Sequence, residues 1–78
     1  MDSDNKIILF SKRLQEDKVI WFRLYNALYK VSFDQQNLFI RQEGLDVSYH
    51  YSSLQDLFYD YVVYGANLID SIEHIQII

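Results

Sequence analysis

Three side chains late in the sequence have the types and spacing of a metal site. Asp70, Glu73 and His74 stand at positions i, i+3 and i+4, so a helix would gather them on one face. One imidazole and two carboxylates are ligands that divalent metal ions accept. Solvated helix faces often carry the same combination. We therefore keep the three residues as metal candidates and expect no resident metal or other cofactor.

The groups that could serve acid–base or nucleophilic catalysis do not form a recognisable motif. Asp56 and Asp60 are one helical turn apart and could act as a carboxylate pair. Ser52 and Ser53 follow His50 closely, but both serines suit the start of a helix, where they would cap backbone N–H groups. The two isolated glycines cannot form a phosphate-binding loop. We expect no enzymatic activity.

Aromatic residues make up 17% of the chain and supply the best candidates for contact with a partner. Trp21, Tyr25 and Phe39 lie in segments with strand character. Tyr59 and Val63 are i and i+4 neighbours on the outer side of an expected helix, where they would form an exposed apolar strip. These five residues predict a non-catalytic protein-interaction module.

Charge is distributed unevenly along the chain, whose net charge is −4. All seven lysines and arginines lie at or before Arg41, whereas residues 42–78 carry six acidic residues. Two copies could therefore associate with the basic half of one facing the acidic half of the other. Alternatively, the two halves lie side by side in one molecule and partly neutralise each other. The predicted partner is a second copy or another protein.

The best basic patch for nucleic acid would combine Trp21 and Arg23 with Lys18, Lys30 and Arg41 across a sheet. Because the protein as a whole is acidic, we do not expect nucleic acid to be its partner. No apolar stretch approaches the roughly 20 residues of a membrane span. The beginning of the chain is acidic, with an apolar run of only four residues, unlike a signal peptide. These features predict a soluble, cytoplasmic protein.

Periodicity places these candidates on a small set of elements. Residues 28–33 and 47–51 alternate between apolar and polar side chains, as half-buried strands do. Residues 18–25 favour a strand, although a helix over 18–31 also fits their apolar spacing. The expected strands are 6–11, 18–25, 28–33, 38–42 and 47–51, with turns at 26–27, 34–37 and 43–46.

Helical spacing begins after the last of these strands. The residues at i, i+3, i+4, i+7 and i+8 form an apolar stripe that predicts an amphipathic helix over about 53–64, ended by Gly65: Leu54, Leu57, Phe58, Tyr61 and Val62. The tail over 66–78 is ambiguous, and we favour a short helix followed by a strand that joins the sheet.

The resulting prediction is a single α+β domain over residues 1–78. It has a small antiparallel meander of four to five strands, with one main helix packed on one face. One helix leaves one sheet face without a cover, which favours self-association. Tyr49, Tyr51 and Tyr61 are expected at the core or its edge. The alternative is a small-ligand or metal-binding regulatory protein. Its site would be an aromatic rim formed by Tyr49 and Tyr51, together with His50 or His74.

Overall fold

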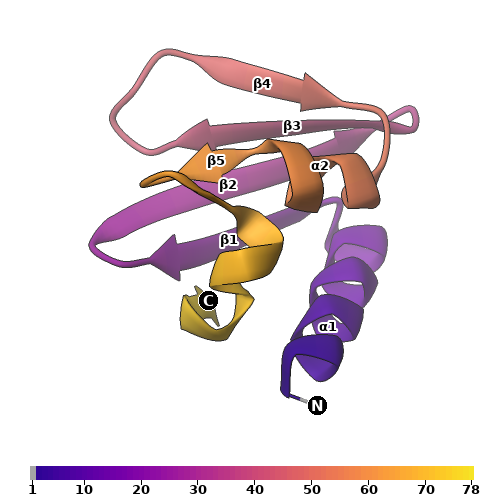
Figure 1. Ribbon diagram of the computed structural model, residues 1–78. Helices are drawn as coiled ribbons and strands as arrows, with labels where there is room; N and C mark the ends of the chain where they lie inside the picture. The colour runs from indigo at the N-terminus through magenta and orange to yellow at the C-terminus, as the bar shows by residue number, and fades with distance from the viewer. Residues whose placement is uncertain (1) are drawn as a thin grey trace.

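The computed structural model describes the backbone of residues 2–78 and the side chains of residues 5–78. It has the predicted α+β fold (Figure 1). The elements, in chain order, are α1 (Asp2–Asp17), β1 (Val19–Leu24), β2 (Ala27–Asp34), β3 (Asn37–Gln42), β4 (Ser48–Tyr51), α2 (Leu54–Asp60), β5 (Val62–Val63), β6 (Ala66–Asn67), the 3-10 helix η1 (Leu68–His74) and β7 (Ile75–Ile77).

The main sheet contains five antiparallel strands in the order β4-β3-β2-β1-β7. Strands β1 to β4 form the predicted meander, so residues 18–31 are strand and not helix. Strand β7 joins the other edge of β1, where Leu24 faces Ile75 and Phe22 faces Ile77. The tail is therefore a short helix followed by a strand in the sheet, as expected.

Alternation along β1 separates two faces of the sheet. Ile20, Phe22 and Leu24 are buried, whereas Trp21 is half-buried and Arg23 is exposed. Helices α1, α2 and η1 lie on one side of the sheet and cover the buried face (Figure 1). Within residues 2–78, no helix covers the other side, which includes Trp21 and Arg23, and the sequence predicted such an uncovered face.

The strand predicted over residues 6–11 is wrong, because this segment belongs to the long helix α1. Ile7, Phe10 and Leu14 form its inward stripe at i, i+3 and i+7, whereas Ile8 and Leu9 are exposed. The apolar run therefore mixes two faces of a helix. Residues 12–17 after it continue α1 to Asp17, and the Lys, Arg, Leu, Gln and Glu among them are good helix formers.

Helix α1 ends in a left-handed residue that turns the chain directly into the sheet. Lys18 has a φ of 63°, and its N–H donates to the carbonyl of Leu14 at 2.9 Å. Its own carbonyl accepts from the N–H of Phe33 at 2.9 Å, at the far end of β2. Helix and sheet are thus joined without a flexible linker.

Helix α2 starts where the sequence predicts but ends at Asp60 instead of residue 64. Ser53 caps it, with Oγ accepting from the N–H of Asp56 at 3.1 Å. Strands β5 and β6 then form a small hairpin around Tyr64 and Gly65, whose φ angles of 54° and 81° are both positive. A two-residue turn with this geometry favours glycine, so Gly65 serves the hairpin and does not end the helix.

The other turns lie close to their predicted positions. Gln35 and Gln36 connect β2 to β3 with positive φ angles of 50° and 70°, inside the predicted loop over 34–37. The turn between β1 and β2 consists of Tyr25 and Asn26, one residue earlier than expected.

Two hydrogen bonds connect α1 to the C-terminal segment. Lys6 Nζ donates to the carbonyl of Glu73 at 3.0 Å, and Arg13 donates to the carbonyl of Ile78 at 2.7 Å. The core lies beneath these helices and is filled by Phe10, which contacts the rings of Phe22 and Phe58. Across residues 2–78, none of the helices combines the length and the apolar character that a membrane crossing would need.

Candidate functional site

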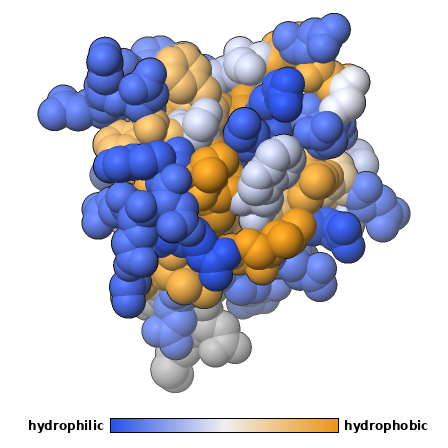
Figure 2. All heavy atoms as spheres, turned by 180° about the vertical axis from the view of Figure 1, so that it is seen from behind, coloured by the Kyte–Doolittle hydropathy of each residue, from blue (hydrophilic) through white to orange (hydrophobic). Residues whose placement is uncertain are grey.

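The open face of the sheet carries a cross-strand row of aromatic and basic side chains. Trp21 on β1 faces Lys30 on β2, and Lys30 in turn faces Arg41 on β3. The Lys30 ammonium lies 5.6 Å from the centre of the Trp21 ring, within cation–π range. Figure 2 looks onto this side of the molecule, where apolar and aromatic side chains lie among hydrophilic ones.

A second row runs parallel to the first, toward the β4 edge. Phe39 on β3 faces His50 on β4, with ring centroids 5.2 Å apart. His50 Nε2 lies 2.8 Å from the Oδ1 of Asn37, which holds the imidazole over the same face. Phe39 is 38% exposed although it stands in the middle of a paired strand. The fold therefore leaves part of the Phe39 side chain in contact with solvent.

Between the two rows lies a hollow of about 210 Å³. Its walls are the cations of Lys30 and Arg41, the hydroxyls of Ser32 and Ser48, and the ring of Phe39. Two cations and two hydroxyl donors around one hollow suit a carboxylate or another small anion. We name Trp21, Lys30, Phe39, Arg41 and the two serines the open-face site.

Charge differs between the open face and the layer of α2 and η1. Arg23, Lys30 and Arg41 point from the open face, and Arg41 is paired with Glu43 at 3.7 Å. Both partners of this pair are exposed, so it contributes little to stability and leaves Arg41 free to change partner. The opposite layer of α2 and η1 carries acidic side chains that are all exposed: Asp56, Asp60, Asp70 and Glu73.

The structure divides the five predicted contact residues among separate places. Trp21 and Phe39 share the open face, whereas Tyr59 is exposed on α2, in the layer that covers the other face. Tyr25 lies in the β1–β2 turn with positive φ, and its ring meets those of Tyr64 and His74 at 5.5 Å each. The five residues therefore do not form one surface.

The predicted exposed strip of Tyr59 and Val63 is wrong. Because α2 ends at Asp60, Val63 lies in β5, where its side chain is only 8% exposed and belongs to the core. Its neighbour Val62 is 59% exposed instead. Two-residue alternation in β5, which the helical reading missed, decides which valine faces outward.

The metal candidates and the catalytic candidates are not assembled into sites. Asp70, Glu73 and His74 are exposed on η1, and within residues 5–78 no group of three His, Cys, Asp or Glu side chains is arranged to hold a metal ion. His50 points to the open face, where it meets Asn37, while Ser53 caps α2. The histidine is therefore not placed as the base of this serine.

A cavity lies at the β4 edge of the covered face, where the alternative, ligand-binding prediction placed Tyr49 and Tyr51. It has a volume of about 440 Å³, and three of its walls are Tyr49, Tyr51 and Tyr61. Asp60 and Gln42 also line it. We name it the tyrosine cavity. Tyr61 is buried and Tyr51 is half-buried, as predicted for the core and its edge, whereas Tyr49 is 49% exposed.

Burial alters the acidity of these phenols. It raises the pKa of Tyr61 to about 12, with smaller contributions from the neighbouring tyrosines. The pKa of Tyr51 is also raised, first by burial and then by the negative charge of Asp60. Both phenols are therefore neutral near neutral pH. The effect of Asp60 on Tyr51 shows that its negative charge acts on the groups that line the cavity.

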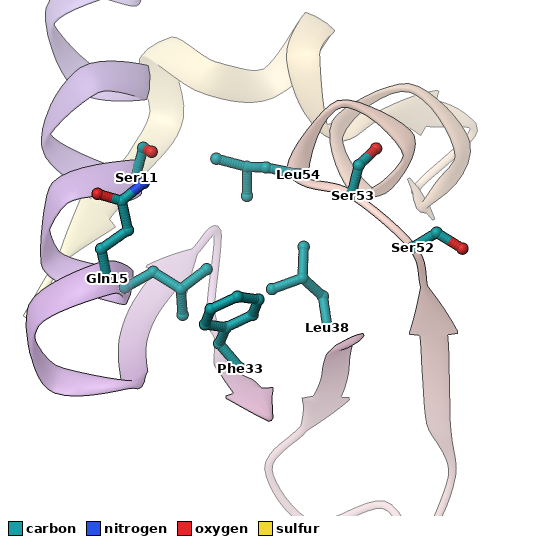
Figure 3. Close-up of a pocket in the computed structure, with 8 residues that line it drawn as sticks. Ser11, Gln15, Phe33, Leu38, Ser52, Ser53 and Leu54 are labelled. Atoms are coloured by element: carbon teal, nitrogen blue, oxygen red, sulfur yellow. The ribbon is translucent and has the colours of Figure 1, made fainter. Parts of the chain in front are cut away.

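A smaller hollow of about 110 Å³ separates α1 from the start of α2 (Figure 3). Phe33 and Leu38 form its apolar floor, and Leu54 points into it from the α2 side. Ser11 and Gln15 on α1 supply polar groups at its edge. No titratable side chain lines this hollow, so it has no group for acid–base chemistry.

Comparisons with known proteins add no assignment to this geometry. The chain matches no protein-family model, no curated protein and no solved structure. Any function must therefore be argued from the surfaces and cavities themselves.

Proposed function

We propose that this chain is a small non-catalytic protein-interaction module that uses the open-face site as its contact surface. The observation that carries the proposal is the hollow between Lys30, Arg41 and Phe39 on a sheet face without a covering helix. Aromatic side chains and arginine are the residue types that most often dominate binding energy at protein interfaces.

The site combines two kinds of contact that a partner must match. Trp21 and Phe39 offer apolar ring surface, which gains free energy when a partner removes it from water. Lys30 and Arg41, with the serine hydroxyls, offer donors for a carboxylate. The matching surface is therefore acidic and partly apolar.

A second copy of the chain supplies such a surface. The layer of α2 and η1 exposes Asp56, Asp60, Asp70 and Glu73, and it also presents the half-exposed ring of Tyr59. The open face of one copy would then pack against the helical layer of the next. The open face and the helical layer lie on opposite sides of the sheet. In a two-fold dimer, the open face of each copy therefore cannot contact the helical layer of the other. The contact would instead repeat from copy to copy, in a ring or an open chain.

Single-stranded nucleic acid is the competing partner for this face, since aromatic rings and cations on a sheet also suit stacked bases. Its affinity, however, comes mainly from many neutralised phosphates. The open face offers three cations, Arg23, Lys30 and Arg41, on a molecule whose net charge is −4. This balance favours a protein partner.

The first test is the solution mass, measured by light scattering on a sizing column over a range of concentrations at low and high salt. We expect a mass above that of the monomer that decreases as salt screens the charged contact. A monomer under every condition would contradict self-association and direct attention to another acidic protein.

A matched pair of charge reversals then locates the contact. Lys30→Glu changes the open face, whereas Lys12→Glu makes the same charge change on the exposed surface of α1. We expect only Lys30→Glu to reduce the mass. Equal effects of both variants would assign the result to net charge and not to the open-face site.

A further inference from the structure

The tyrosine cavity has the shape of a cage. The Tyr61 ring meets that of Tyr49 at 65° with centroids 5.5 Å apart, and that of Tyr51 at 87° with centroids 6.5 Å apart. Rings at these angles and distances pack edge to face, so the three phenols form one continuous aromatic part of the cavity lining. The volume of about 440 Å³ lies within the range of small-ligand sites.

The charges around the cavity favour a cation. Asp60 lines it, and none of the eight lining residues is basic. Glu43 and Asp46 lie in the loop that carries the lining residue Leu45, while Arg41 points to the opposite face of the sheet. Tyr49, Tyr51 and Tyr61 line the same cavity, and an aromatic ring attracts a cation held above its plane.

The rim of the cavity is apolar and exposed. Leu45, Val47, Tyr49 and Val62 each leave about half or more of their surface in contact with solvent, and all four line the cavity. Large apolar side chains that converge at one opening mark a contact site. An apolar rim disfavours the strongly hydrated ammonium of lysine, which would lose water there without replacement hydrogen bonds. A methylated ammonium spreads its charge over methyl groups and suits such a rim.

We propose that the tyrosine cavity binds a methylated ammonium group, such as that of choline or of trimethyllysine. Tyr49, Tyr51 and Tyr61 form the cage, and Asp60 supplies the opposing charge. This activity goes beyond the interaction through the open-face site, because the cavity lies on the other side of the sheet and is lined by none of the residues of that site. Asp60 alone also belongs to the acidic layer that we propose as the second contact surface.

Space for the rest of such a ligand continues from the cavity. A neighbouring hollow of about 190 Å³ shares Gln42, Tyr61 and Val62 with it. The two hollows together can take an ammonium group and part of the chain that bears it. That chain can belong to a free small molecule or to a peptide, and the probes below distinguish the two sources.

Titration calorimetry on the full chain tests the proposal with four probes. These are choline, its neutral isostere with a tert-butyl group in place of trimethylammonium, a short peptide containing trimethyllysine, and the same peptide with unmodified lysine. We expect a methylated ammonium to bind about tenfold more tightly than its neutral or unmethylated counterpart. Tighter binding of choline would indicate a free ligand, and tighter binding of the methylated peptide would indicate a side chain.

Three variants locate the binding. Tyr49→Ala removes a wall that is 49% exposed, so the fold should persist while binding weakens about tenfold. Tyr49→Phe keeps the ring and should keep the affinity. Ile8→Ala removes an exposed side chain of α1 that lines neither the cavity nor the neighbouring hollow, and it should have no effect.

Asp60→Asn provides a second, independent reading, since it removes the charge without changing the shape of the cavity. It should weaken binding of the cation and leave the neutral isostere unaffected. The proposal is wrong if neither methylated probe binds, if the neutral isostere binds as tightly as choline, or if Tyr49→Ala leaves the affinity unchanged.

Discussion

The two faces of the main sheet are built from the same strands but have opposite properties. On the covered face, Phe22, Ile40 and Leu24 are fully buried beneath α1, α2 and η1. On the open face, Trp21, Lys30 and Phe39 occupy alternate positions of the same strands and contact solvent. The fold therefore completes its core on one side alone. The side chains of the other face do not contribute to the core and remain available to contact a partner.

The largest expected difference concerns Phe10, which fills the core from α1 and contacts the rings of Phe22 and Phe58. Phe10→Ala should lower the free energy of unfolding by about 3–5 kcal/mol, measured by urea denaturation. Ile8→Ala, on the exposed side of the same helix, should change it by about 0.5 kcal/mol or less. Similar losses for both variants would mean that α1 packs with another side inward.

A smaller effect separates two adjacent valines of β5. Val63→Ala should cost about 2 kcal/mol, because it removes buried methyl groups from the core. Val62→Ala should leave the unfolding midpoint nearly unchanged, because its side chain is exposed. If Val62 proves the more costly of the two, the strand alternation described for β5 must be reversed.

Alkaline pH should loosen the covered face through its phenols. Because burial raises the pKa of Tyr61 from 10.0 to about 12, the folded protein holds this proton where the unfolded chain has lost it. The stabilisation from Tyr61 is complete below pH 10 and is lost as the pH rises through about 12. Unfolding measured across this window should be less pH-dependent in Tyr61→Phe. An unchanged slope would show that other groups cause the loss.

On the open face, a substitution should affect association more than stability. Phe39→Ala should change the free energy of unfolding by no more than about 1 kcal/mol, yet it should weaken self-association about tenfold. Chemical denaturation and light scattering on the same samples separate the two quantities. A large loss of stability with unchanged association would make Phe39 a core residue and remove it from the open-face site.

The sequence allowed the sheet to be predicted because strand alternation and turn residues are local signals. Residues 28–33 alternate cleanly, and the predicted loop over 34–37 contains the observed turn. Helix α1 was missed because the run from Ile7 to Phe10 combines inward and outward residues of one helix. The end of α2 was missed because Val62 and Val63 fit a helical period as well as a hairpin.

The candidate sites depend on contacts that no local pattern contains. Trp21 and Phe39 could be selected by type, but only the strand register brings Lys30 and Arg41 beside them. The tyrosine cavity requires Tyr61, after α2, to lie against Tyr49 and Tyr51 on β4. The residues that line the cavity come from separate elements. The tyrosines could therefore be identified in the sequence, but their arrangement around one cavity could not.

The pairing of β1 with β7 sets the order in which the sheet can assemble. Strands β1 to β4 can pair as soon as they leave the ribosome, because each hairpin is local. The second edge of β1 must wait for Ile75 and Ile77, far later in the chain. Until then, unpaired backbone groups of β1 are open to strands of other nascent chains. Closing this edge requires the longest-range strand pairing in the sheet.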